Sequence, residues 1–313
     1  MRPSSLRDSC KTGSKVLEFD PRPITGGFFE IKAYAKLNLF LDVLEKRPDG
    51  YHDIVSVMQS IDLHDDLKIY RTGNAQGFIF FTNSDEVPND DSNLVARAAK
   101  LLIDEYKIKE SLVITLTKRI PVGAGLAGGS ADCAATLKGI DRLLKLNIPF
   151  DELQDIAASL GADVPFCLVG GTCLAGGIGE KLTQLSPHPE CSILLAFPGI
   201  HVSTKKIFEK LCVSSRNQNK KKLENILSSL RNNELTEVAL SLYNVFTDLT
   251  SREFPVVGTL ITKLNTCGAI GASMTGTGSA VFGYFARETD AIKAQQALEG
   301  ETKTYLVKPF NRS

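Results

Sequence analysis

The sequence predicts an α+β protein of two lobes, and three observations support this fold class. The chain has 313 residues, more than one hydrophobic core usually organises. Period-two alternation, typical of half-buried strands, dominates residues 31–70, whereas helical spacing recurs between about residues 94 and 160. After about residue 190 a second set of strands and helices follows without a long linker. We therefore expect two lobes that share an interface and a cleft.

The composition excludes several classes of partner. Lys and Arg together number 36, as do Asp and Glu, so there is no basic excess for a nucleic-acid backbone. No uncharged apolar run is long enough to span a bilayer, and the seven cysteines and four histidines lack metal-binding spacing. We expect small-molecule ligands, no nucleic acid, no membrane, a monomer or homodimer, and a cytoplasmic location in a bacterial cytosol rather than a plastid.

The first predicted strand spans Ile31–Asp42, because apolar and polar residues alternate along it. Lys36 and Asn38 share its polar face and therefore point to one region. A Pro-Asp-Gly turn follows. Two further strands are predicted at Ile54–Ile61 and Asp65–Tyr70.

The next part of the chain alternates between helices and a strand. Helical spacing predicts helices at Leu94–Tyr106 and Phe150–Leu160, the latter ended by Gly161. Between them lie a strand at Ser111–Thr117 and the segment PVGAGLAGGSADCAATL (121–137), where a glycine-rich loop leads into a helix that runs to about Leu146.

The second half reads as a sheet with helices on one face. Its predicted strands are CSILLAFPG (191–199), two strands joined by a glycine turn in GASMTGTGSAVFGYF (271–285), and TYLVKPF (304–310). Its predicted helices span residues 203–212, about 222–246, Pro255–Thr266 and Asp290–Leu298.

The glycine-rich loop matches G-x-G-x-x-G literally from Gly123 onward, but its context disfavours a dinucleotide fingerprint. The preceding strand is polar on one face, and the next element is a second helix instead of a strand. No Gly-Lys-Ser/Thr follows, so a Walker A loop is excluded. The remaining interpretations are a tight strand-to-helix turn or a phosphate site, in which backbone N–H groups, Ser130 and Lys118 face an anion.

Two other constellations admit a functional and a structural interpretation. Lys36 could be an ordinary strand lysine, and the Tyr51-His52 pair could serve packing alone. Asp163, in GADVPF, could cap the next short helix, or it could accept a proton from a substrate hydroxyl.

Taken together and in this order, these segments resemble the GHMP kinase superfamily. The resemblance covers about residues 31–310 and is carried by AYAKLNLFLDVLEKRPDGYH (33–52), SNLVARAAKLL (92–102), KRIPVGAGLAGGSADCAATL (118–137), GADVPF (161–166), FPGIHVST (197–204) and MTGTGSAVF (274–282). The A-K-L-N-L and D-G-Y-H motifs resemble those of one branch of this superfamily. The kinases of that branch phosphorylate a cytidine-diphosphate-linked methylerythritol in non-mevalonate isoprenoid synthesis.

The resemblance implies an ATP-dependent kinase with its active site in the cleft between two lobes. The N-terminal lobe would be ribosomal-protein-S5-like and would hold ATP (residues 31–190). The C-terminal lobe would be ferredoxin-like (191–313), after an extension at residues 1–30. Magnesium is expected with ATP, but its protein ligands are not indicated.

The resemblance also implies roles for individual residues. Asp163 would be the general base, and Lys36 would hold Asp163 and the phosphoryl oxygens. The substrate pocket would contain Asn38, Tyr51, His52, Thr204 and Phe208, with His52 reading the cytosine between Tyr51 and Phe208. The nucleotide would contact Asn93, Lys118, Pro121, Val122, Gly123, Ala124, Gly125, Leu126, Ala127, Gly128, Gly129, Ser130 and Ala131.

Two positions depart from the family loop, which usually reads G-L-G-G-G-S-S. Ala127 replaces a glycine and costs about 1–2 kcal/mol if its φ is positive, and Ala131 removes a hydroxyl. Three rivals remain: a GHMP kinase for mevalonate or homoserine, a dinucleotide-binding protein, and a non-catalytic ATP-binding regulator. The Tyr51-His52 pair argues against the first rival, and Lys36 with Asp163 argues against the last.

Overall fold

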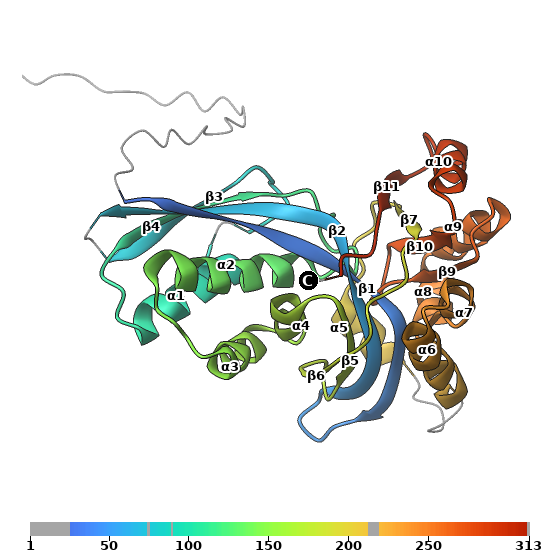
Figure 1. The fold of residues 1–313 in the computed structure, drawn as a ribbon, viewed down its shortest axis with the longest axis horizontal. Coiled ribbons are helices and arrows are strands. Elements are labelled where there is room, and N and C mark those ends of the chain that lie inside the picture. The colour runs from blue at the N-terminus through green and yellow to red at the C-terminus, as the bar shows by residue number, and fades with distance from the viewer. Residues whose placement is uncertain (1–25, 74–75, 89, 212–218, 312–313) are drawn as a thin grey trace, which may run out of the picture.

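A long antiparallel strand pair forms the centre of the N-terminal lobe (Figure 1). The computed structural model describes residues 26–73, 76–88, 90–211 and 219–311. Within them, one sheet has the order β3-β4-β2-β1-β8, and β5 pairs with β2 and β6. Its strands are β1 (Phe28–Lys46), β2 (His52–Gly73), β3 (Gly77–Thr82), β4 (Ser111–Thr117), β5 (Thr172–Gly176), β6 (Lys181–Gln184) and β8 (Tyr243–Asn244).

Four helices lie on one face of this sheet, with α3 packed against the other helices (Figure 1). They are α1 (Leu94–Glu105), α2 (Gly128–Leu144), α3 (Phe150–Leu160) and α4 (Val164–Val169). Helix α2 approaches the strands closely because it carries small residues. A Cβ at Gly139, for example, would lie 2.5 Å from Cδ1 of Ile69 in β2. This close packing fixes α2 against β2.

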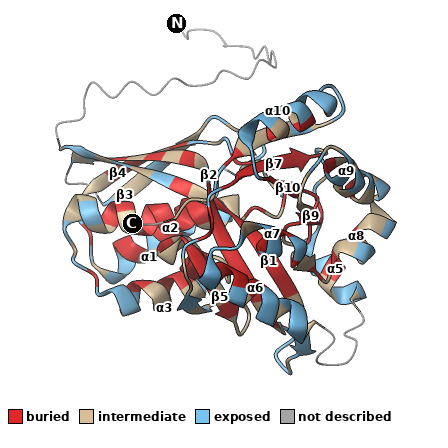
Figure 2. Ribbon diagram, turned by 45° about the vertical axis from the view of Figure 1, so that its right-hand side comes forward, coloured by how far each residue is buried: buried red, intermediate tan, exposed pale blue. Residues whose placement is uncertain are grey.

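The C-terminal lobe contains a sheet of order β11-β7-β10-β9. Its strands are β7 (Ser192–Phe197), β9 (Gly271–Met274), β10 (Val281–Phe285) and β11 (Lys303–Val307), and its helices are α5 (Thr204–Lys210), α6 (Lys220–Asn232), α7 (Leu235–Leu240), α8 (Thr247–Glu253), α9 (Pro255–Thr266) and α10 (Glu288–Ala297). Every residue of β7 is buried, as Figure 2 shows in red. The strand therefore lies between two apolar layers.

The two lobes share a hydrophobic core. Leu37 and Leu39 of β1 belong to the same buried cluster as Ile193 and Leu195 of β7. Two C-terminal segments also cross to the first lobe: β8 pairs in parallel with β1, and the Phe310 N–H donates to the Ser60 carbonyl. The predicted division at residues 190 and 191 stays a prediction. Residues 1–25 of the predicted extension lie outside the described residues, and its last three residues begin β1.

Most predicted elements are confirmed, and two predictions are wrong. The strands predicted at 54–61 and 65–70 are one strand, β2, because both halves pair continuously with β1 through bulges. The long helix predicted at 222–246 is α6, α7 and β8, because Asn233 adopts a left-handed φ of 59° and ends α6. Helix α8 and strand β3 were not predicted. No helix in the described ranges is long and apolar enough to cross a membrane.

Candidate active site

A cleft of about 940 Å³ lies between the lobes and is lined by most of the predicted site residues. The N-terminal lobe contributes the polar face of β1, the residues before β2, the start of α1, the glycine-rich loop and Asp163. The C-terminal lobe contributes α5, Phe246 and the turn between β9 and β10. Ala131 is the exception among the predicted residues, because its side chain packs in the core of the N-terminal lobe.

Lys36 and Asp163 meet in the middle of this cleft. Lys36 Nζ lies 3.7 Å from Asp163 Oδ2 and donates a hydrogen bond to Asn38 Oδ1 at 2.6 Å. The Lys36 side chain is only 4% exposed, whereas that of Asp163 is 33% exposed. The predicted common orientation of Lys36 and Asn38 is therefore confirmed. The lysine is held in one place, and the carboxylate stays accessible from the cleft.

The Asp163 carboxylate is not used to cap a helix. Asp163 precedes α4 at the N-cap position, but its side chain accepts no capping hydrogen bond. The structural alternative left open by the sequence is thereby removed. The carboxylate faces the cleft with Lys36 as its cationic neighbour.

Asn38 joins the two lobes at the floor of the cleft. Its Oδ1 accepts from the Gly276 N–H at 2.9 Å, and its Nδ2 donates to Ser56 Oγ at 2.8 Å. Its backbone N–H donates to Thr275 Oγ1 at 3.1 Å. Because Asn38 is 1% exposed and both its Oδ1 and Nδ2 are hydrogen-bonded, it holds Lys36 and the C-terminal turn in fixed positions.

The glycine-rich loop exposes backbone N–H groups to the cleft. Helix α2 starts at Gly128, so the N–H groups of its first turn have no partner within the helix. The dipole of a 17-residue helix adds about half a positive charge at the same end. The loop is also fixed to β1, since the Lys36 N–H donates to the Leu126 carbonyl at 3.1 Å. This arrangement suits a bound phosphate.

Ala127 occupies the left-handed position before α2. Its φ is +56° and its ψ is 30°, a conformation that favours glycine. The positive φ on which the predicted strain depends is therefore observed, and Ala127 carries strain of about 1–2 kcal/mol.

One end of the cleft is lined by aromatic side chains. The rings of His52 and Phe208 lie 5.2 Å apart, and Phe208 packs on Phe246 at 4.6 Å. Tyr51 also lines the cleft and is 59% exposed, and Thr204 Oγ1 contacts Thr277 Oγ1 at 3.2 Å. Burial, and then the nearby Lys46 ammonium, lower the pKa of His52 from its usual value. The imidazole is therefore neutral at pH 7.

Asn93 and Lys118 line another part of the cleft. The Asn93 amide caps α1, since its Oδ1 accepts from the Val95 N–H at 2.8 Å and its Nδ2 donates to the Pro88 carbonyl. The sequence suggested that Lys118 faces a bound anion, but the structure does not leave this lysine free. It is bound by Asp65 and Asp132, and its side chain is 6% exposed.

Sequence reasoning missed several residues of this site. Thr275, Gly276 and Ser56 position Asn38, and Asp65 and Asp132 hold Lys118. The M-T-G-T-G-S-A motif was a signal for the first two, because its glycines permit close backbone contact with another loop. No local pattern signals Ser56 or Asp65, whose partners lie far away in the sequence.

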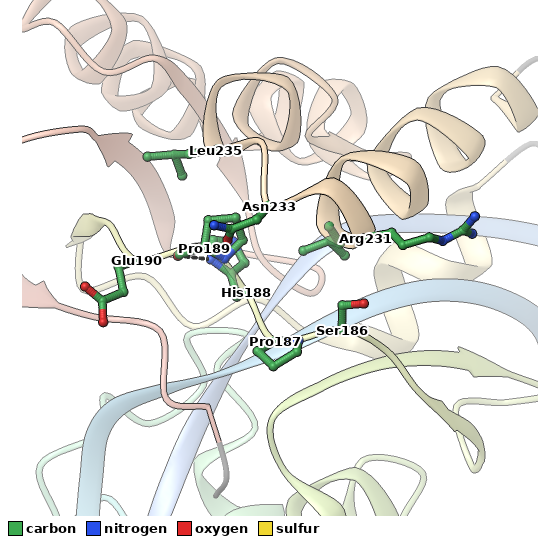
Figure 3. Close-up of a pocket in the computed structure, with 9 residues that line it drawn as sticks. Ser186, Pro187, His188, Pro189, Glu190, Arg231, Asn233 and Leu235 are labelled. Atoms are coloured by element: carbon green, nitrogen blue, oxygen red, sulfur yellow. Dashed lines mark hydrogen bonds between the residues drawn. The ribbon is translucent and has the colours of Figure 1, made fainter.

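A separate hollow lies beside the segment 186–190, between it and the ends of α6 and α7 (Figure 3). His188 in its wall is 2% exposed, and its Nδ1 lies 2.6 Å from the Pro189 carbonyl. Burial lowers the pKa of His188 to about 4, so the ring is neutral. Arg231 extends away from His188 in Figure 3. Without converging charged groups, this hollow is a poor candidate for phosphate chemistry.

Comparisons with known proteins agree with the geometry of the cleft. The family description "GHMP kinases N terminal domain" matches residues 93–171, and "GHMP kinases C terminal" matches residues 217–303. A protein from Caldicellulosiruptor bescii named 4-diphosphocytidyl-2-C-methyl-D-erythritol kinase is 42% identical, over 86% of this chain and 94% of its own length. A protein of the same name from Clostridium botulinum is 40% identical, over 88% of this chain and 96% of its own length.

Solved structures give the same result. A crystal structure of 4-(cytidine 5'-diphospho)-2C-methyl-D-erythritol kinase superposes with a TM-score of 0.77 at 30% identity, covering 90% of this chain and all of that one. Homoserine kinase from Cytophaga hutchinsonii gives a TM-score of 0.75 at 18% identity, covering 94% of this chain and 97% of that one, which indicates the fold alone. The two-lobed α+β fold predicted from the sequence is thereby confirmed. The chain belongs to the GHMP kinases and, within them, to the family of 4-diphosphocytidyl-2-C-methyl-D-erythritol kinases.

Proposed function

We propose that the protein transfers the γ-phosphoryl group of ATP to a hydroxyl of 4-diphosphocytidyl-2-C-methyl-D-erythritol, giving the 2-phosphate and ADP. The observation that carries this proposal is the approach of Lys36 Nζ to Asp163 Oδ2 between the glycine-rich loop and an aromatic pocket. Phosphoryl transfer needs positioning and stabilisation of spread negative charge, and this cleft supplies both. Such transfer is the reaction named for the relatives.

The residues in the middle of the cleft have distinct roles in the proposed step. Asp163 accepts the proton of the attacking hydroxyl, whose oxygen then forms the new bond to phosphorus. Lys36 stabilises the negative charge that develops on the transferred group, and Asn38 keeps its ammonium in place. The N–H groups at the start of α2 hold the phosphates of the nucleotide.

The aromatic end explains the choice of substrate. Tyr51, His52 and Phe208 offer two flat faces and one neutral imidazole, which suit a pyrimidine base that stacks and accepts hydrogen bonds. Mevalonate and homoserine carry no such base. These residues therefore favour the cytidine-linked substrate over the smaller alcohols that other GHMP kinases use.

Magnesium is proposed to arrive with ATP. Among the described residues, no group of three or more His, Cys, Asp or Glu side chains is placed to hold a metal ion. A magnesium ion often takes only one or two protein carboxylates, besides phosphates and water. The ion would add positive charge beside Lys36.

A panel of acceptors tests the substrate assignment. Purified protein is incubated with Mg-ATP and 4-diphosphocytidyl-2-C-methyl-D-erythritol, mevalonate or homoserine, and ADP release is measured. We expect turnover with the cytidine-linked alcohol, and at least about a hundredfold lower kcat/KM with the others. Equal turnover of mevalonate or homoserine would overturn the assignment. A thermal shift with NADH but none with Mg-ATP would favour a dinucleotide-binding protein instead.

We infer a cytoplasmic setting in a bacterium, and a monomer or homodimer. The bacterial setting is supported by the relatives, which are proteins of bacteria such as Caldicellulosiruptor bescii.

A further inference from the structure

A buried cluster of three charged residues lies under the nucleotide end of the cleft. Lys118 Nζ lies 2.5 Å from Asp65 Oδ2 and 2.8 Å from Asp132 Oδ2. None of the three side chains is more than 6% exposed. They come from the segment after β4, from β2 and from the second turn of α2. The cluster therefore joins three elements directly behind the phosphate-binding loop.

The two carboxylates of this cluster are not equivalent. Both oxygens of Asp65 are bonded, because Oδ1 also accepts from the N–H groups of Arg119 and Ile120, at 2.5 and 2.9 Å. Asp132 uses only Oδ2, and its buried Oδ1 has no hydrogen-bond partner among the described residues. Asp132 nevertheless lies in the wall of the cleft, beside Gly128 and Gly129. One buried oxygen there is without a partner, which is costly unless a ligand supplies one.

Charge decides which form Asp132 takes. With both carboxylates ionised, the cluster would carry a net charge of −1 next to a loop that binds phosphate anions. A proton on Asp132 removes this charge and turns the free oxygen into a donor. Burial, opposed by Lys118 and reinforced by Asp65, raises the pKa of Asp132 to about 8. The neutral form therefore predominates at pH 7.

We propose that Asp132 keeps a proton on Oδ1 and donates it in a hydrogen bond to an acceptor atom of the bound nucleotide. This inference rests on the part of the proposed function that makes ATP the phosphoryl donor, and it assigns Asp132 as a further binding residue for that nucleotide. Only the protonated form binds well. Above pH 8 the free protein has lost this proton, so binding of ATP must take one up from solution.

Charged and titratable groups face Asp132 from several elements, and Asp65 contributes to its raised pKa through its charge and a side-chain hydrogen bond. Lys118 faces Asp132 from the segment after β4. Burial lowers the pKa of Lys118, but the two carboxylates outweigh this effect and raise the pKa above its usual value. Asp65 faces Asp132 from β2 with both oxygens bonded. On the α1 side, Arg97 stays charged, and burial raises the pKa of the neighbouring Cys133 to about 12.

Titration calorimetry of Mg-ATP tests the inference. It is performed at pH 7 and pH 9, in buffer pairs with different ionisation enthalpies, so that proton uptake is measured directly. We expect almost no uptake at pH 7, uptake approaching one proton at pH 9, and roughly tenfold weaker binding at pH 9. The terminal phosphate of ATP is ionised at both pH values and does not contribute.

Two variants separate this role from a structural one. In Asp132→Asn, the amide oxygen can accept from Lys118 while its NH₂ group supplies the donor, so we expect binding at pH 7 to be retained without proton uptake at pH 9. Asp155→Asn, on the exposed face of α3, is the matched control and should behave like the wild type. Wild-type protein that binds ATP equally at both pH values without uptake overturns the inference, whether or not the variant folds. Absence of ATP binding at pH 7 would instead contradict the proposed function.

Discussion

At the scale of single residues, the methyl group of Ala127 introduces conformational strain at the start of α2. Its φ of +56° lies in the region where a Cβ is strained by about 1–2 kcal/mol. In Ala127→Gly this strain is removed, but the greater backbone entropy of unfolded glycine offsets part of the gain. We expect the free energy of unfolding to rise by up to about 1 kcal/mol, as measured by chemical denaturation.

A neighbouring alanine provides the control. Ala131 lies inside α2 and is buried, so Ala131→Gly should lower the free energy of unfolding by about 1 kcal/mol. If both glycine substitutions destabilise the protein equally, the left-handed strain at position 127 is not relieved by glycine, and this account of the loop is incorrect.

His52 gives the aromatic pocket a defined pH dependence. Burial and the Lys46 ammonium lower its pKa, so the ring becomes protonated only at a pH below its ordinary value of about 6.5. The KM for the cytidine-linked substrate should stay constant from pH 8 down through that value and rise only in more acidic solution. Lys46→Met should move the midpoint of this rise to higher pH, whereas Lys46→Arg should leave it in place. A midpoint unchanged in Lys46→Met would remove Lys46 as a cause.

At the scale of elements, two loops from different lobes touch at Gly125. A Cβ there would lie 2.3 Å from the Thr275 carbonyl oxygen, and its φ of +83° is strained for any other residue. Gly125→Ala should therefore push the turn between β9 and β10 away from the glycine-rich loop. We expect a lower melting temperature and impaired kinase turnover.

Gly129→Ala is the matched substitution for this test. Its Cβ would meet only Cδ1 of Leu94, at 3.8 Å, and Gly129 lies in α2, where alanine is favoured. The melting temperature should be maintained or raised. Equal destabilisation by both substitutions would show that the loop contact at Gly125 has no special importance.

Elements with regular periodicity could be predicted from the sequence. The predicted bounds of β4, α3 and α9 agree with the observed ones, and the predicted α1 is only one residue too long. Each of these elements has a clear apolar face and defined ends. The helix predicted over 222–246 failed because a left-handed Asn233 divides a continuous helical pattern into α6 and α7. The short strand β8 depends on pairing with β1, which no local pattern reveals.

At the scale of the whole molecule, β7 of the C-terminal lobe is buried between the N-terminal lobe and the helices of its own lobe. Its residues alternate between the cluster that contains Leu37 and the cluster beneath α9 and α10. The lobes are thus joined by one apolar layer, while Asn38 and Thr275 join them at the floor of the cleft. Lys36 and Asp163, the proposed catalytic groups, are therefore held in place by tertiary packing.

The same scale explains which parts of the site were predictable. Lys36 with Asn38 follows from the period of one strand, and the glycine-rich loop follows from its composition. The meeting of Lys36 with Asp163 was expected from the family resemblance, and the structure brings them to 3.7 Å. Asp65 and Asp132, 67 positions apart, both bind Lys118, and this arrangement depends on the sheet register and lacks any signal in the sequence.

The most direct test of the central claim compares wild-type protein with Asp163→Asn in single-turnover kinase assays, with Asp155→Asn as the surface control. If Asp163 is the general base on the substrate hydroxyl, the asparagine variant should bind ATP and the cytidine-linked substrate with nearly unchanged Kd. Its phosphoryl transfer should be slower by about 10²–10⁴-fold. Transfer at the wild-type rate by Asp163→Asn would contradict the claim.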